Sequence, residues 1–592
     1  MNNEKLFKLR KIIKKNKVDG YLVPHNDEYF NESIPEANKR LEWLTSFDGS
    51  AGLALILQEK AYLFVDGRYT IQAKKQVDNK LFDVIHSKDR NIYQLLNSLT
   101  SKLTIGFDPK IHSIINIKNL KKNITNSSIS FKEIKNNLID LVWDKKPVLI
   151  FNDIKIHELK FTGQPSHEKI SHVNELIKKY LADSIIITDC ESIAWLLNIR
   201  GSDLDFTPIP LSILILNNNN EIIFFTNSNI NTSIKKHFGN KIKVEKLCKV
   251  ENYLIRLGQN KLKVIIDERT CSFWAYKILE SHGAEILFKN DPCLILKACK
   301  NKTELNGIRN AHIRDGISLV KTLYWIKESI QKKLLNEIAV SDKLFEFRSN
   351  NENFTGLSFP TIAGTGANGA IVHYRPSKEN SREINEGDLL LMDSGGQYFD
   401  GTTDVTRTIV IGEPTKEKKI MFTKVLKGHI AIASAVFPYD TTGHQLDILA
   451  RQFLWKSGLD YEHGTGHGVG TFLNVHEGPQ NISKYENNIK LEEGMIISNE
   501  PGYYKEGEYG IRIENLVAVR RENNFSSEKK FLKFETLTLA PIDLNLIEIG
   551  LLDKNEIEWI NSYHEKVFSQ LSNSLSTEIK EWLRLETKKI NI

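Results

Sequence analysis

Hydrophobic and polar positions in the first part of the chain follow two different periods. Apolar side chains recur at helical spacing over residues 4–15, with lysines mostly on the other face. Short apolar runs typical of strands follow at 21–23, 53–57 and 62–65. Helical segments that alternate with short strands predict an α/β domain, which we place at residues 1–147.

The same alternation begins again after a lysine- and asparagine-rich region, residues 118–137, and a predicted linker at 143–147. Helices are predicted at 167–181, 192–199 and 272–280, and strands at 184–188, 211–216, 221–226 and 264–266. The four asparagines at 217–220 predict a hairpin turn between two of these strands. We therefore expect a second α/β domain over residues 148–300.

The pattern changes in the last part of the chain, which we treat as a third domain, residues 301–592. A long helix is predicted at 304–329, followed by a glycine-rich, strand-dense region at 354–519. Residues 530–592 are predicted to return to helix. Their expected packing anchors are Trp559, Tyr563, Trp582 and Leu583.

Length, composition and charge set limits on function. The chain has 592 residues, 41% hydrophobic and 26% charged, which is enough for several globular domains. Its net charge of +6 comes from 80 basic and 74 acidic residues without a basic cluster, so we expect no nucleic-acid partner. No apolar run has membrane length, and the first helix is too polar for a signal peptide. We expect a cytoplasmic protein without a membrane partner; a transit peptide is the less favoured interpretation of that helix.

Cysteine usage agrees with a reducing compartment. The five cysteines contain no CxxC pair, and their number is odd. Such a set predicts buried free thiols rather than disulfides.

Candidate chemistry begins with two aspartates. Asp393 ends the apolar run 389–393, and Asp404 begins the β-branched strand 404–410. Neighbouring strands would bring both carboxylates to one point, and an aspartate attached to a buried run is costly unless a cation or a partner neutralises it. Taken alone, the pair is more simply interpreted as turn-forming aspartates.

Three further residues change that interpretation. His467 lies in the glycine-rich segment 463–468, Glu500 ends a strand, and Glu514 shares a strand face with Arg512 by simple alternation. Four carboxylates and one imidazole, with no thiolate, form a hard ligand set that suits Mn²⁺ or another divalent first-row metal better than a structural zinc. Four negative charges offset two divalent cations, and such a pair of ions fits hydrolysis of an acyl bond.

The segments around these residues closely resemble the motifs of the pita-bread metallopeptidases. The motifs are Asp393–Gly395, Gly401–Thr408, His463–Gly468, Val475–Pro479, Asn499–Tyr504 and Gly510–Asn515. Within that superfamily the chain resembles the three-domain, cytosolic form of aminopeptidase P, and the resemblance extends to Ser46–Gly52 and Asp66–Tyr69. It implies a fold of α/β and α+β type, with two creatinase-like N-terminal α/β domains followed by a pita-bread catalytic domain and a C-terminal helical extension.

The resemblance also implies metal ligands, carried over residue by residue. Asp393 resembles the ligand of one metal, and His467 with Glu500 those of the other. Asp404 and Glu514 resemble the bridging carboxylates. Glu500 is in addition our candidate for the catalytic proton shuttle.

Substrate residues are implied in the same way. His373 and His476 resemble the pair that hydrogen-bonds the substrate and the tetrahedral intermediate, and His463 a histidine that lines the same pocket. Arg68 resembles a first-domain residue that reaches toward bound peptide. Without the resemblance His373 would be an ordinary loop histidine.

Two arginines beside these residues carry weaker predictions. Arg512 is expected in the substrate pocket, where it orients a carboxylate; a solvent-facing salt bridge is the alternative. Arg375 stands where a small residue is expected, which leaves the shape of the substrate loop open.

The implied activity is removal of the first residue from peptides whose second residue is proline, with two divalent ions, Mn²⁺ by preference, and a homodimer. A prolidase, which cuts only Xaa-Pro dipeptides, is the nearest alternative. A pita-bread protein without metals that only binds partners is another, although all five ligand positions are filled. A methionine aminopeptidase is disfavoured because two domains precede the catalytic one.

Overall fold

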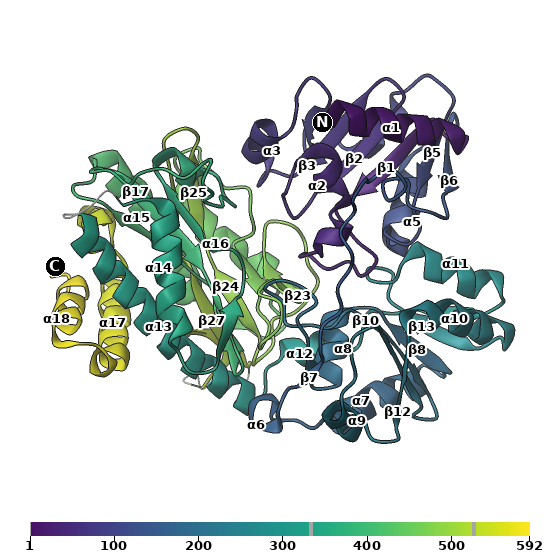
Figure 1. The fold of residues 1–592 in the computed structure, drawn as a ribbon. Helices are drawn as coiled ribbons and strands as arrows, with labels where there is room; N and C mark the ends of the chain where they lie inside the picture. The colour runs from purple at the N-terminus through teal and green to yellow at the C-terminus, as the bar shows by residue number, and fades with distance from the viewer. Residues whose placement is uncertain (1, 331–334, 524–528, 592) are drawn as a thin grey trace. The chain divides into compact units, whose positions relative to one another are not determined.

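The computed structural model describes residues 2–330, 335–523 and 529–591. The chain divides into two compact units, the first made of Met1–Leu159 with Gln164–Leu294, the second of Lys160–Gly163 with Ile295–Ile592. Figure 1 labels their elements. Within the described ranges, no helix is both long enough and apolar enough to cross a lipid bilayer.

The first unit begins with a six-stranded mixed sheet. Across it the strands run β4 (Asp83–His86), β3 (Ala61–Val65), β2 (Leu53–Leu57), β1 (Gly20–Pro24), β5 (Leu103–Phe107) and β6 (Ile129–Glu133). Its helices are α1 (Asn2–Lys15), η1 (Glu36–Asn38), α2 (Arg40–Thr45), α3 (Thr70–Gln76), α4 (Ile92–Asn97) and α5 (Ile114–Asn123). The lysine- and asparagine-rich region thus contains the end of α5 and all of β6, elements that its composition did not predict.

A second six-stranded sheet forms the rest of this unit. Its order is β12 (Ile242–Glu245), β11 (Ile222–Thr226), β10 (Ser212–Asn217), β8 (Ser184–Ile187), β13 (Lys263–Ile266) and β14 (Glu285–Phe288). The other elements of this unit are β7 (Lys155–Ile156), α7 (Ser166–Lys179), α8 (Cys190–Leu196), β9 (Ile199–Arg200), α9 (Thr232–Phe238), η2 (Leu247–Lys249), α10 (Val250–Gln259) and α11 (Phe273–Ser281). α6 (Leu159–Thr162) and α12 (Cys293–Ala298) begin in this unit and continue into the second. β10 and β11 pair antiparallel, with Leu216 opposite Ile222, so the predicted asparagine turn is confirmed.

Local sequence explains several of these elements. β8 is buried along its whole length and is made of Ser-Ile-Ile-Ile, because β-branched side chains pack well inside a sheet covered on both faces. α5 begins where the Ser113 side chain accepts a hydrogen bond from Asn116 N, and α8 where Asp189 caps Glu191 N in the same way. Of the five cysteines, Cys248 is exposed and Cys299 is half-buried, which corrects the expectation that all are buried.

The described residues of the second unit form four sheets. A six-stranded sheet has the order β21 (Val436–Pro438), β28 (Phe531–Thr536), β27 (Asn515–Glu522), β24 (Ile496–Asn499), β22 (Gly466–Gly468) and β23 (Glu477–Ile482). The three smaller sheets are β16 (Ile362–Thr365), β17 (Leu389–Ser394) and β20 (Val405–Val410); β15 (Phe354–Leu357), β18 (Gly396–Tyr398) and β19 (Gly401–Thr402); and β25 (Gly502–Lys505) with β26 (Tyr509–Arg512). Apart from β28 and the last residues of β27, these strands lie within the region 354–519 that was predicted to be strand-dense.

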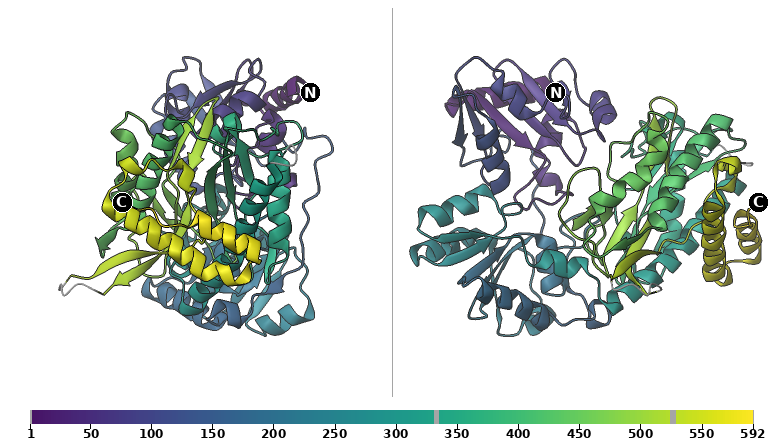
Figure 2. Two further views of the ribbon diagram at one scale, coloured as in Figure 1. Left: turned by 90° about the vertical axis from the view of Figure 1, so that its left-hand side faces the viewer. Right: turned by 180° about the vertical axis from the view of Figure 1, so that it is seen from behind.

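Helices cover the sheets of the second unit. They are α13 (Lys302–Ile330), α14 (Glu337–Ser349), α15 (Lys416–Ala433), α16 (Gly443–Trp455), α17 (Lys554–Leu571) and α18 (Thr577–Glu586), with the short η3 (Gly366–Ala370), η4 (Leu544–Leu546), η5 (Ile549–Leu551) and η6 (Ser572–Ser574). α17 and α18 both contact α13, and Figure 2 shows the two C-terminal helices lying side by side.

One prediction for the C-terminal region is wrong, and another is confirmed. Residues 531–536 form β28, which pairs with β27 and β21, and not the helix that was predicted. The expected anchors behave as predicted, because Tyr563, Trp582 and Leu583 are buried in the main core and Trp559 packs against it.

Candidate metal centre

Two adjacent strands carry the two aspartates. Asp393 lies on β17, and Asp404 directly precedes β20. The strands are neighbours, as the sequence predicted, and they pair antiparallel with Asp393 opposite Thr406. Both aspartates are buried.

The three other candidate ligands come from neighbouring strands of the six-stranded sheet. His467 lies on β22, Glu500 directly follows β24, and Glu514 directly precedes β27. The backbone N–H of Glu514 donates to Thr406 O over 3.1 Å, and this bond joins the sheet of the glutamates to the sheet of the aspartates. All five residues are therefore brought to one place by strand ends.

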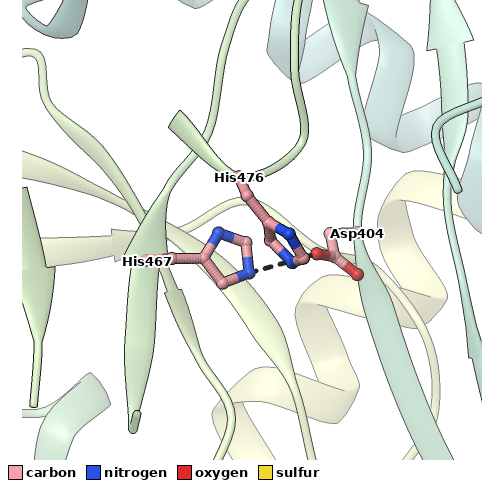
Figure 3. Close-up of side chains that lie close together, drawn as sticks. All are labelled: Asp404, His467 and His476. Carbon is pink, nitrogen blue, oxygen red and sulfur yellow. Dashed lines mark ion pairs between the residues drawn. The ribbon is translucent and has the colours of Figure 1, made fainter. Parts of the chain in front are cut away.

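Their ligand atoms meet in three overlapping groups, each within 4.8 Å. The groups are Asp393, Asp404 and Glu514; His467, Glu500 and Glu514; and Asp404, His467 and His476. His467 Nε2 lies 3.4 Å from Asp404 Oδ2 and 3.5 Å from Glu500 Oε1. Figure 3 shows the third group, in which His467 and His476 approach Asp404 from separate segments.

Hydrogen bonds orient these ligand atoms. His467 Nδ1 lies 2.9 Å from Gly468 O, so this nitrogen carries the proton and leaves Nε2 bare toward the carboxylates. Thr406 Oγ1 donates to Glu514 Oε2 over 2.8 Å, and Ser498 Oγ donates to Glu500 Oε1 over 3.1 Å. A bare imidazole nitrogen with a fixed tautomer is the form that binds a metal.

Without added positive charge, it is electrostatically unfavourable to hold the four carboxylates of the cluster so close together. Burial, with Asp404 and Glu500 as negative neighbours, raises the pKa of Asp393 to about 6 although Arg512 opposes the shift. Burial and the neighbouring carboxylates also raise the pKa of Glu500, and that of Glu514 well above its usual range. Four carboxylates held this close need positive charge that the surrounding side chains supply only in part.

Divalent cations fit this cluster. Within the described part of the chain, the buried oxygens Asp393 Oδ1 and Asp404 Oδ1 have no hydrogen-bond partner, and buried carboxylate oxygens are normally satisfied. The donor set is oxygen-rich with one bare imidazole nitrogen, which suits hard or borderline divalent ions. The residues present therefore fit a pair of bound metal ions.

Arg512 contacts Asp393, whereas the sequence placed it beside Glu514. Its Nη2 donates to Asp393 Oδ2 over 2.5 Å, and its Nε donates to Thr406 Oγ1 over 3.1 Å. The predicted continuous strand is broken, because β26 ends at Arg512 and β27 begins at Asn515, so simple alternation fails between them. Arg512 does orient a carboxylate, but a different one.

Tyr504 joins Arg512 to His463, a role for which the sequence gave no signal beyond its place after Glu500. Arg512 Nη1 donates to Tyr504 Oη over 2.7 Å, and Tyr504 Oη lies 2.8 Å from His463 Nε2. His463 Nδ1 faces Gly464 O at 2.8 Å, so His463 Nε2 accepts the tyrosine proton. Burial raises the pKa of Tyr504 to about 12, so this hydroxyl stays protonated.

The other predicted substrate residues lie on loops. His476 is exposed, and its ring centroid lies 4.4 Å from that of His467. His373 is half-buried beside Val372, whose carbonyl accepts from Arg512 Nη2 over 3.4 Å; the neighbouring Arg375 is exposed. Their roles toward substrate stay predictions.

Arg68 belongs to the first unit, between β3 and α3. Its guanidinium makes two hydrogen bonds to Asp66, of 3.0 and 2.7 Å, and lies over the Tyr69 ring. Its contact with peptide stays a prediction.

Comparison with family models assigns most of the chain. Residues 5–141 and 145–304 match two models of the creatinase/prolidase N-terminal domain, and residues 306–521 match metallopeptidase family M24. Residues 530–590 match the C-terminal region of peptidase M24. The molecule is therefore a hydrolase of the metallopeptidase class, with two creatinase-like domains before its catalytic domain. The boundaries at 147/148 and 300/301 stay predictions.

Comparison with individual relatives identifies the family within the metallopeptidases. The chain is 40% identical to a probable Xaa-Pro aminopeptidase P of Laccaria bicolor, over 98% of this chain and 93% of the relative, and 38% identical to one of Coprinopsis cinerea, over 99% and 98%. Among solved structures it matches an X-prolyl aminopeptidase of Caenorhabditis elegans, a cytosolic enzyme with a di-nuclear active site. That match has 32% identity, a TM-score of 0.95 and full coverage of both chains. The chain belongs to the Xaa-Pro aminopeptidase P family.

Proposed function

We propose that this metallopeptidase hydrolyses the peptide bond between an N-terminal residue and a proline at the second position. The observation that carries the proposal is the convergence of Asp393, Asp404, His467, Glu500 and Glu514 within the three groups described above. The names of the relatives support the same substrate class.

Each cluster residue has a proposed part in metal binding. Asp393 would hold one ion, His467 and Glu500 the other, and Asp404 and Glu514 would bridge the two. When bound, such a pair of ions supplies Lewis acidity and a water of lowered pKa. Arg512 and Thr406 keep the Asp393 and Glu514 carboxylates directed into the cluster through their hydrogen bonds.

Side chains of the chain itself would handle the proton and the substrate. Glu500, whose pKa is raised by burial and by negative neighbours, is suited to take a proton from the attacking water and to deliver it to the proline nitrogen. His373 and His476 would donate hydrogen bonds to the scissile carbonyl oxygen as negative charge develops on it. The ring nitrogen of proline has no N–H and a fixed φ, so a pocket shaped for the ring can select it.

A peptide panel tests the reaction. We expect the enzyme to release arginine from Arg-Pro-Pro and to leave Arg-Ala-Ala intact, because only the first presents a proline nitrogen as leaving group. Hydrolysis restricted to Xaa-Pro dipeptides would favour a prolidase. Binding of Arg-Pro-Pro with no turnover by the metal-loaded protein would favour a binding module.

Manganese is the metal that we propose, because the ligand set is rich in carboxylate oxygens and contains no thiolate. After chelation and dialysis, Mn²⁺ is expected to restore cleavage of Arg-Pro-Pro to a higher kcat than Zn²⁺. The reverse order would contradict this preference.

We propose a cytoplasmic location and a homodimeric state as the remaining expectations. The cytosolic description of the Caenorhabditis elegans relative supports the first. Fractionation of the native cells and light scattering of the purified protein are the respective measurements. Binding assays with nucleic acid and with lipid vesicles are expected to be negative.

A further inference from the structure

Glu477 follows His476 directly and differs from it in burial. His476 is exposed, whereas the side chain of Glu477 is 0% exposed. Two lysine ammonium groups surround this carboxylate: Lys300 Nζ bonds to Oε1, and Lys297 Nζ lies 3.3 Å from Oε2. A carboxylate buried this completely is stable in the charged form only beside such partners.

Both lysines belong to the segment by which the chain joins the second unit. Lys297 lies on α12, and Lys300 N donates to Gly494 O over 3.0 Å. Gly494 has φ +92°, and a Cβ at this position would lie 2.7 Å from Lys300 O, so the two backbones are in close contact. The segment is thereby attached just before β24, the strand that Glu500 directly follows.

The backbone of Glu477 packs against the strand that carries His467. β23 begins at Glu477, which pairs with Gly468 of β22. A Cβ at Gly468 would lie 2.4 Å from Glu477 O, so the two strands touch without space for a side chain. A displacement of Glu477 would therefore move His476 relative to His467.

We propose that Lys297, Lys300 and Glu477 form a positioning clamp that holds His476 against the ligand cluster. His476 itself is exposed, and its backbone N–H makes a bond of 3.3 Å to Asn474 Oδ1. The buried charges next to it supply the rigid attachment that a substrate-binding histidine needs, because small misplacements of such groups slow turnover strongly. This proposal rests on the proposed function, and it makes two lysines remote from substrate determinants of turnover.

The test uses the full-length, metal-loaded enzyme and Arg-Pro-Pro. Lys300→Met is expected to lower kcat about tenfold, while KM changes less than about twofold and metal content is unchanged, because His476 acts on charge that develops in the transition state. Lys297→Met leaves the Lys300–Glu477 bond in place and should lower kcat about threefold. Unchanged kcat in both variants would overturn the clamp.

A double-mutant cycle separates positioning from general loss of stability. If Lys300 acts through His476, the Lys300→Met/His476→Ala enzyme should be no slower than His476→Ala alone. If the fold-losses of kcat in the two single variants multiply in the double variant, the proposal is overturned. Arg348→Met is the matched control, because the Arg348–Asp315 pair is equally buried in the same unit, and any loss that it causes should multiply with His476→Ala.

A variant that fails to fold and a wild-type enzyme that lacks the proposed activity can each be told apart from failure of the clamp. If Lys300→Met does not fold, the same cycle is run with Lys297→Met, which retains a paired carboxylate. If the wild-type enzyme does not cleave Arg-Pro-Pro, the proposed function fails. Normal wild-type turnover with unaltered variants overturns the clamp alone.

Discussion

At the scale of single residues, Asp404 shows how the cluster depends on a cation. Its Oδ2 lies 3.4 Å from His467 Nε2, and its Oδ1 is buried without a hydrogen-bond partner among the residues that the structure describes. Asp404→Ala is expected to lower both bound metal and kcat, the latter at least about a thousandfold. Metal analysis and steady-state kinetics measure the two effects.

The exposed Asp440 provides a control for that substitution. Its carboxylate pairs only with Lys490 among the ion pairs of the described residues, and its side chain is 74% exposed. Asp440→Ala should leave turnover unchanged. Normal turnover in Asp404→Ala would contradict the bridging role of that residue.

Tyr504 gives a second prediction at this scale. Tyr504→Phe removes the hydroxyl that accepts from Arg512 and donates to His463, and the loss of these two part-buried bonds corresponds to about a tenfold lower kcat/KM. Tyr503→Phe changes the neighbouring ring, which is also half-buried but packs against Tyr509, and should have little effect. Equal losses in the two variants would assign the effect to general packing.

The sequence placed the candidate ligands better than their supporting contacts. Asp393 and Glu500 follow apolar runs, so their positions near strand ends could be predicted from the chain alone, whereas Glu514 was expected inside a continuous strand and directly precedes β27. The partner of Arg512 could not, because Asp393 is 119 positions away and the break in the strand depends on tertiary packing.

At the scale of elements, α17 carries a pH-sensitive contact. Ile542 N donates to His564 Nε2 over 3.0 Å, so this nitrogen must be unprotonated in the fold. Burial, and to a smaller extent the positive charge of Arg407, lowers the pKa of His564 from 6.5 to about 3. As pH falls, His564 therefore becomes protonated at a higher pH in the unfolded chain than in the folded one. By pH 5 this difference lowers the free energy of unfolding by about 2 kcal/mol.

Calorimetry at several pH values tests the contact. The wild-type unfolding temperature should fall between pH 6.5 and 4. His564→Gln retains an acceptor for Ile542 N but binds no proton, so its curve should be flatter. Parallel curves for the two proteins would contradict this origin of acid sensitivity.

Helices and strands could be predicted from the sequence where one hydrophobic period extended over many residues. The alternation in 531–536 places Leu532 and Phe534 inside, yet the segment is short and is stabilised by pairing with β27 and β21 rather than by its own preference. The same reason explains β6, which pairs with β5 although its composition is polar.

At the scale of the whole molecule, the two units have separate cores. The strands of the first unit enclose clusters around Tyr21 and Phe225, and α13, α15 and α17 of the second enclose another around Leu426. We expect two calorimetric transitions, of which only that of the second unit falls on chelation, by about 5–10 °C, because ligands stabilise the unit that binds them. Equal shifts in both transitions would contradict a metal site confined to the second unit.

The four residues Lys160–Gly163 have a consequence for dissection of the enzyme. Asn301 Nδ2 donates to Thr162 O over 2.8 Å, Phe161 stacks on Phe399, and Gly163 touches Thr303, so this short stretch is built into the catalytic unit while the chain on both sides of it belongs to the other. After cleavage between residues 294 and 295, Lys160–Gly163 would belong to the N-terminal fragment but would still be packed within the C-terminal fragment. A protease nick there should yield two pieces that still co-elute under native conditions.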